Sequence, residues 1–153
     1  MTTTRLSLYF LGVNLVMTIA MAIILIMLDL AFGLEIGGSG PAMGVLIGSI
    51  IMASRKFASL EDEPPSPGRY WRLSLGMTAA AVVANLITVA AVGSLIAPDL
   101  LSAASASGGT FVFLLIVLGI TFVIELAIIR FAFAYFSRRE IQVRMAAKIN
   151  EFE

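Results

Sequence analysis

The most constraining feature of this 153-residue sequence is a series of long stretches with almost no charged side chains. A bilayer core is about 30 Å thick, and a helix needs about 20 mostly apolar residues to cross it. Within hydrocarbon every backbone amide must be paired inside the protein, which favours helices. The sequence therefore predicts an all-α fold, an integral membrane four-helix bundle with spans at about 6–28, 41–57, 73–97 and 110–136.

The second of these stretches is the weakest. Its uncharged part runs only from Ile36 to Ser54 and begins with several glycines. A short span, a re-entrant segment and an interfacial helix are each compatible with it. We predict a span, because four spans place the basic residues on one side of the membrane.

Cytoplasmic flanks of membrane spans carry an excess of Lys and Arg. With four spans and both termini inside, all ten Lys and Arg fall on the cytoplasmic side, whereas the outer loops hold Asp29, Glu35 and Asp99 and no base. Every Tyr and Trp also lies near an inner end of a span, where amphipathic rings collect at the headgroup level: Tyr9, Tyr70, Trp71 and Tyr135. The prediction is a multi-pass protein with cytoplasmic N- and C-termini.

Two cytoplasmic segments lie outside the spans. The loop Glu61–Gly68 is an acidic patch followed by prolines, and it is either a solvated connector that breaks before Arg69 or a docking loop. Residues 137–153 form a separate tail after the membrane domain of residues 1–136. We predict an amphipathic C-terminal helix that lies on the inner headgroups or extends the last span straight into the cytoplasm. Its apolar stripe is Ile141, Met145, Ile149 and Phe152.

The composition excludes several kinds of chemistry. The chain has no Cys and no His, which removes disulfides, thiol catalysis, Cys–His zinc sites, iron–sulfur clusters and His-ligated haem. Ten Lys and Arg balance ten Asp and Glu, so nothing points to nucleic acid as a partner. We assign no catalytic, cofactor-binding or metal residue and expect no enzyme activity. Whether a lipid, quinone or pigment lies between spans is left open.

Four polar residues within the spans are the functional candidates: Glu125, Asn85, Asn14 and Arg130. Counted from the cytoplasmic end of their spans, Asn85 and Glu125 both lie roughly 18–20 Å deep at 1.5 Å per residue, which predicts a hydrogen-bonded pair. Asn14 lies one turn nearer the cytoplasm. Arg130 is about 140° around the helix from Glu125, so the sequence predicts no direct pair between them.

A charged side chain inside a membrane is costly unless it is paired, so Glu125 is the residue that most strongly indicates a specific role. Three interpretations of this acid are open. It is an interhelical hydrogen-bonding group worth on the order of 0.6–2 kcal/mol, a contact to another subunit, or the protonatable site of a transporter.

Two stripes of small residues predict close helix packing, either within the chain or against another subunit. The first stripe is Gly40, Gly44 and Gly48, and the second is Gly76, Ala80 and Ala84.

The chain resembles an uncharacterised family of small four-span bacterial inner-membrane proteins. The likeness lies in Arg55-Lys56-Phe57, in Gly68-Arg-Tyr-Trp-Arg-Leu73, in Asn85 and in the run Ile129 to Phe133. It implies the architecture and a bacterial inner (plasma) membrane location, and it carries no activity across. We expect a non-enzymatic accessory or stabilising subunit of a larger inner-membrane complex, in contact with the lipid bilayer and other membrane protein subunits. The alternative is a small proton-coupled transporter or channel that acts as a homo-oligomer through Glu125.

Overall fold

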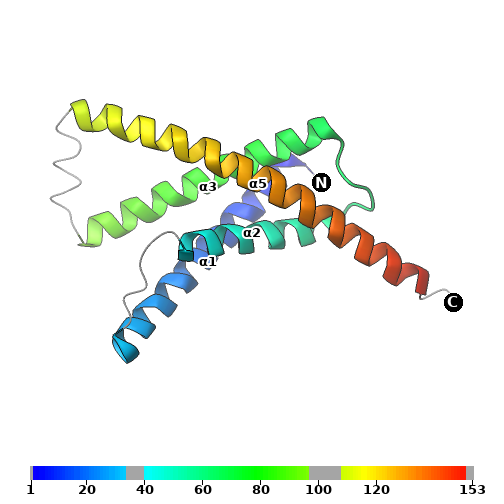
Figure 1. Cartoon of the computed structure of the whole chain (residues 1–153), viewed down its shortest axis with the longest axis horizontal. Helices are drawn as coiled ribbons and strands as arrows, with labels where there is room; N and C mark the ends of the chain where they lie inside the picture. The colour runs from blue at the N-terminus through cyan, green and yellow to red at the C-terminus, as the bar shows by residue number, and fades with distance from the viewer. Residues whose placement is uncertain (1, 34–39, 97–107, 151–153) are drawn as a thin grey trace.

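The computed structural model describes residues 2–33, 40–96 and 108–150, and these residues are helical with one short connection (Figure 1). The four helices are α1 (Thr3–Phe32), α2 (Gly40–Ala58), α3 (Pro67–Ile96) and α5 (Gly108–Asn150). Each predicted span falls on one of them. The predicted outer-loop acids Glu35 and Asp99, and the last residue of the third span, lie outside the described residues.

Local sequence explains where two of the helices begin and end. Thr2 caps α1 by accepting a hydrogen bond from Arg5 N–H, and α1 ends where Gly33 adopts a left-handed φ of 62°. Asp29 therefore lies inside α1, not in a loop as predicted. The third helix begins at Pro67, within the predicted loop Glu61–Gly68 and before the span predicted from residue 73, because proline fits the first turn of a helix.

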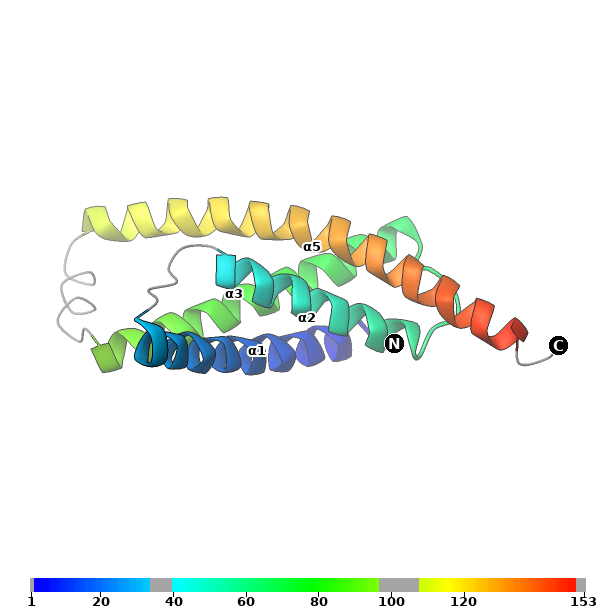
Figure 2. The same ribbon diagram turned by 60° about the horizontal axis from the view of Figure 1, so that its bottom comes forward.

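The helices pack as a ring in which each one packs mainly against two others, in the order α1, α2, α5, α3. Figure 2 shows α2 and α3 between α5 and α1. Since α1 and α3 begin where α2 and α5 end, one end of the bundle collects most of the charge. We call it the basic end; it lies to the right in Figure 1. Its described bases are Arg5, Arg55, Lys56, Arg69, Arg72, Arg138, Arg139 and Arg144.

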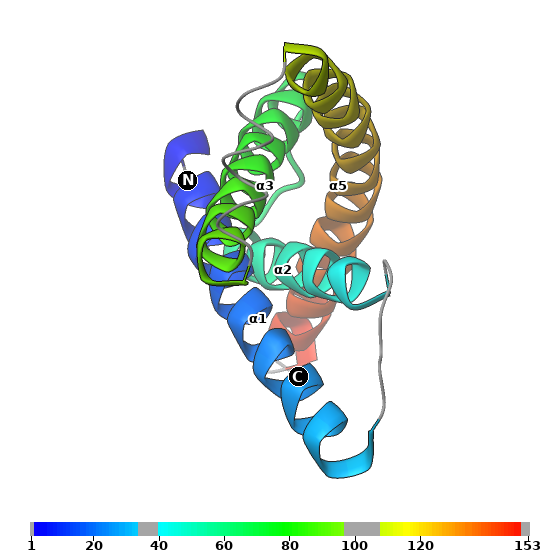
Figure 3. The ribbon, with the colours of Figure 1, turned by 90° about the vertical axis from the view of Figure 1, so that its left-hand side faces the viewer.

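The hydrophobic core occupies only the half of the bundle nearer the basic end. At its centre the Phe133 ring meets Phe57 edge-to-face at 5.7 Å and Tyr70 at 6.0 Å. Residues buried around them come from all four helices: Leu6, Phe10, Ile50, Ala53, Leu73, Met77, Ile129 and Ile141. Toward the other end the helices diverge, as Figures 1 and 3 show.

Three helical segments are long and apolar enough to cross a membrane, namely α1, the Pro67–Ala91 part of α3 and the Leu115–Ala147 part of α5. Among the described helices α2 alone is not one of these three. It contains three glycines and carries Arg55 and Lys56 in its last turn, which lowers its mean hydropathy, and it buries eight of its 19 residues. A helix covered by other helices can carry Gly, Ser and Ala where a lipid-facing helix carries larger apolar side chains.

The last helix runs without a break through residues 136 and 137, where we predicted the boundary between span and tail. Of the two expected arrangements, the structure has the tail extending the last span. The tail packs on the end of α2, where Arg55 Nε lies 3.1 Å from Glu140 Oε1 and Arg144 donates to the carbonyl of Ala58. Ile141 is buried there, whereas Phe152 lies outside the described residues.

Candidate functional site

Asn85 on α3 and Glu125 on α5 form the hydrogen bond that their equal depth predicts. Asn85 Nδ2 donates to Glu125 Oε1 at 2.9 Å. The other carboxyl oxygen, Oε2, is buried and has no hydrogen-bond partner among the described residues. A buried acceptor without a partner is unfavourable, so this carboxyl group is half satisfied within the part of the chain that the structure describes.

Asn14 makes a different contact. Its side chain is buried, and Nδ2 lies 3.4 Å from Ser49 Oγ on α2. Ser49 in turn donates to the carbonyl of Val45 at 2.8 Å, and Thr18 donates to the carbonyl of Asn14 at 2.8 Å. Ser49 was not predicted as the partner. The same depth count could have found it, since Asn14 and Ser49 each lie eight residues from the inner ends of the predicted spans, at residues 6 and 57.

Arg130 contacts an aromatic ring. Its guanidinium carbon lies 3.9 Å from the centroid of Trp71 on α3, a cation–π distance. Within the described residues no ion pair joins Arg130 to Glu125, in agreement with the angle between them on α5. The ring contact was not predicted, although both residues were expected near the same end of the bundle.

A cavity of about 500 Å³ brings most of these polar groups together, with lining residues from all four helices. Its polar lining comes from α1, α3 and α5: Asn14, Thr18, Asn85, Thr88, Thr121 and Glu125. Apolar residues such as Leu25, Leu46 and Ile128 make up most of the remaining wall. Thr18, Thr88 and Thr121 did not stand out in the sequence, because only the tertiary structure places them around one space. The cavity suits an apolar or amphipathic group that carries a hydrogen-bond donor.

This polar layer lies at the level where core packing stops. Asn14 is the last buried residue of α1, and Ala84, next to Asn85, is the last buried residue described in α3. On α5 burial begins only at Ile129, four residues after Glu125. Among the described residues beyond this level on these three helices, none is fully buried.

The small residues divide into those that meet another helix and one that does not. A β-carbon at Gly48 would lie 2.6 Å from Met17 Cε of α1, and one at Gly44 would lie 4.0 Å from Met21 Cε. A β-carbon at Gly76 would collide with Ser7 of α1. Both stripes therefore pack against α1, and Ala80 and Ala84 are buried as predicted.

Gly40 was expected in the first packing stripe and is not part of it. It is the first residue of α2, and nothing lies within 4 Å of where its β-carbon would be. The regular spacing identified the face of the helix, but α1 approaches that face only from Gly44 onward.

Tyr70 also departs from the sequence prediction. It was expected among the rings at the headgroup level, but it is buried and its hydroxyl lies 3.3 Å from Ser137 Oγ. Trp71 and Tyr135, by contrast, are exposed. Consecutive residues of a helix face directions about 100° apart, so Tyr70 and Trp71 cannot both face the same surroundings.

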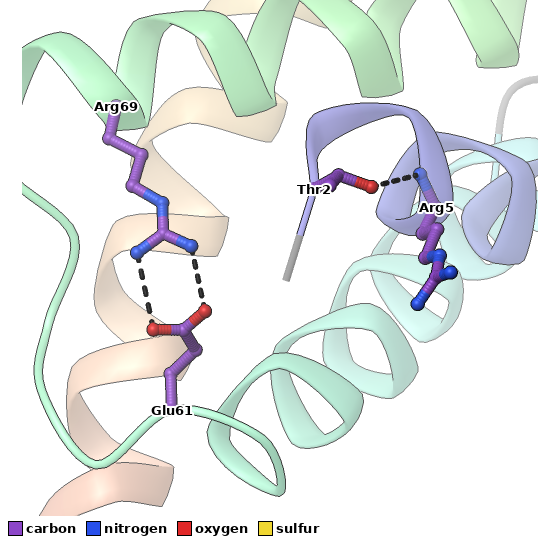
Figure 4. A network of polar contacts seen from close by, with 4 residues as sticks. All are labelled: Thr2, Arg5, Glu61 and Arg69. Carbon is purple, nitrogen blue, oxygen red and sulfur yellow. Dashed lines mark hydrogen bonds and ion pairs between the residues drawn. The ribbon is translucent and has the colours of Figure 1, made fainter.

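Glu61 of the acidic loop forms an ion pair with Arg69 in the first turn of α3. Glu61 accepts two hydrogen bonds from Arg69 at 2.7 and 3.2 Å, in the bidentate arrangement shown in Figure 4. The hydrogen bonds from this guanidinium lower the pKa of Glu61 to about 2. Glu61 is therefore used within the chain. A docking role for the rest of the loop stays a prediction.

Comparison of the chain with protein-family models, with curated proteins and with solved structures finds no match. The resemblance to the four-span bacterial family therefore stays a prediction.

Proposed function

We propose that this protein is a non-enzymatic four-span component of a bacterial inner membrane, with both termini cytoplasmic, and that it is an accessory or stabilising subunit of a larger membrane complex. Three helical segments have the length and hydropathy of spans. The clustering of bases at the basic end supports the orientation, because cytoplasmic flanks carry the excess of Lys and Arg.

The proposal depends on the observation that the described helices share a buried core only in the half of the bundle nearer the basic end. In the half away from the basic end the apolar side chains of three helices are exposed, among them Ile23 of α1, Ile87 of α3 and Ile120 of α5. Lipid tails alone can cover such side chains. They cannot donate a hydrogen bond to the unpartnered Oε2 of Glu125, which lies where the open half begins.

A helix of another membrane protein supplies both kinds of contact. Its apolar side chains would pack between the diverging helices, and an amide, hydroxyl or amine would reach the carboxyl group. Polar groups commonly join membrane helices in this way. This chain would thereby stabilise a partner subunit, and the partner would complete the bundle.

Site-specific photo-crosslinking in native membranes tests the proposal. The crosslinking amino acid is incorporated in place of Ile124, which lines the cavity, or in place of Val123, which is as exposed but does not line it. We expect a heavier adduct of discrete mass from position 124 and none from position 123. Purification in a mild detergent followed by mass spectrometry then identifies the partner. Equal labelling at both positions, or none, contradicts the proposal.

The second candidate is a proton-coupled transporter or channel acting as a homo-oligomer. The specific observation in its favour is that Glu125 and Asn85 line a cavity of about 500 Å³. A self-adduct at twice the chain mass from position 124 would favour it. Glu125→Gln would then abolish proton-coupled flux in vesicles while expression stays intact, whereas an accessory subunit would show altered partner retention and no flux to lose.

A further inference from the structure

A second groove runs between α1 and α2, and it shares no lining residue with the Glu125 cavity. It encloses about 640 Å³, and its walls are almost wholly apolar. Val13 and Val16 form one wall and Met52 forms the other. Gly12 also lines it, and its lack of a side chain deepens the groove, whereas the Met17 methyl covers Gly48.

At the basic end this groove leads to a hollow of about 530 Å³ lined by Arg5, Tyr9, Lys56 and Leu60. Tyr9 lines both spaces, so they adjoin. On α1, Arg5 stands one turn before Tyr9, and on α2, Lys56 stands one turn after Met52. One continuous face therefore passes from two bases through a tyrosine to an apolar channel.

The two bases carry uncompensated charge. Among the described residues neither Arg5 nor Lys56 has a carboxylate partner, whereas Arg55 and Arg69 each have one. In Figure 4 the guanidinium of Arg5 points away from the pair formed by Glu61 and Arg69. Both side chains are exposed and free to bind an anion.

We propose that this face binds one anionic phospholipid. Its phosphate lies between Arg5 and Lys56, Tyr9 lies at the glycerol level, and an acyl chain follows the channel past Gly12. Guanidinium and ammonium groups attract lipid phosphates, and tyrosine favours the level between headgroup and hydrocarbon. The site requires a bilayer around the chain but no protein partner, so it is independent of the accessory role.

Native mass spectrometry of the full chain in detergent tests the charged part of the site. The protein is titrated with phosphatidylglycerol or with phosphatidylcholine of the same acyl chains. We expect preferential binding of one phosphatidylglycerol, weakened about fivefold by Arg5→Gln and about fivefold by Lys56→Gln. The matched control is Arg139→Gln, an exposed base on α5 that does not line the groove. No headgroup preference, or an equal loss in the control, overturns the proposal.

A pair of glycine variants tests the apolar part. At both Gly12 and Gly119, nothing described lies within 4 Å of an added β-carbon, so a side chain can begin there without collision. Gly12→Leu fills the channel and should reduce phosphatidylglycerol binding at least as much as either charge variant. Gly119→Leu on α5 should leave it unchanged.

Inorganic phosphate provides the last arm of the test. A lipid site loses little phosphatidylglycerol when phosphate is added at millimolar concentration, because phosphate makes no contact with the channel. If phosphate displaces phosphatidylglycerol and Gly12→Leu leaves phosphatidylglycerol binding unchanged, the site binds free anions and the lipid proposal is overturned. These outcomes are independent of the crosslinking result, which concerns a different face and a protein partner.

Discussion

Replacing Phe133 by alanine tests whether the bundle is held together at its basic end. Phe133 is 0% exposed and contacts the rings of Phe57 and Tyr70 edge-to-face. Phe131, two residues earlier on α5, is 75% exposed and provides the matched control. Both variants lose the same atoms from the same helix.

The expected magnitude follows from the membrane reference state. In a water-soluble core Phe→Ala costs about 3–5 kcal/mol, part of which is transfer from water. That part largely cancels here, because a separated helix still keeps its phenyl ring in hydrocarbon. The cost that is left is the loss of the two edge-to-face contacts, which contribute about 0.5–1.5 kcal/mol each. We therefore expect Phe133→Ala to lower the free energy of unfolding by about 1–3 kcal/mol, and Phe131→Ala to leave it almost unchanged.

The assay is reversible unfolding in mixed micelles by increasing the fraction of a denaturing detergent. The single tryptophan, Trp71, reports the transition by fluorescence, since its ring lies against Arg130 of α5 in the folded bundle. Circular dichroism confirms that the helices themselves persist. Equal destabilisation by the two variants, or a larger effect of Phe131→Ala, would refute the placement of the core.

Three further predictions concern individual contacts. A double-mutant cycle of Asn85→Ala and Glu125→Ala, measured by the same unfolding assay, should give a coupling energy of about 0.6–2 kcal/mol; a value near zero contradicts the hydrogen bond. The carboxylate of Glu61 stabilises the fold above its ordinary pKa of 4.5, and this contribution of up to about 1 kcal/mol should fade as the pH falls through the folded pKa of about 2. Glu61→Gln should abolish that pH dependence, and Arg69→Gln should reduce it, because the guanidinium of Arg69 is the largest cause of the lowered pKa. Gly76→Leu should lower the unfolding midpoint, because a β-carbon there would collide with the short side chain of Ser7 and lie 3.1 Å from Thr3 Cγ2 of α1; an unchanged midpoint would contradict that close approach.

The sequence predicted the helices because a membrane leaves few alternatives for long uncharged stretches. It also predicted the pair of Asn85 and Glu125, since a helix rises uniformly and equal depth on adjacent helices brings side chains level. The same count applied to Asn14 would have found Ser49. These successes all depend on position along the membrane normal, which residue number alone gives.

The misses depend on rotation about the helix axes and on where helices diverge. Tyr70 faces inward and Trp71 outward, and nothing described lies within 4 Å of where a β-carbon of Gly40 would be. Lipid tails and neighbouring helices are equally apolar, so the sequence of a span does not distinguish the face that packs from the face that meets lipid.

The amino-acid sequence by itself determined that the chain forms long apolar helices, that its bases share one end and that a carboxyl group lies deep within the last span. Only the tertiary structure decided that packing stops at the level of that carboxyl group and that a cavity lies there with one carboxyl oxygen unpartnered. The physical reason is that backbone pairing and charge placement are local to each helix. The length over which the helices stay packed depends instead on many small contacts between residues distant in the sequence.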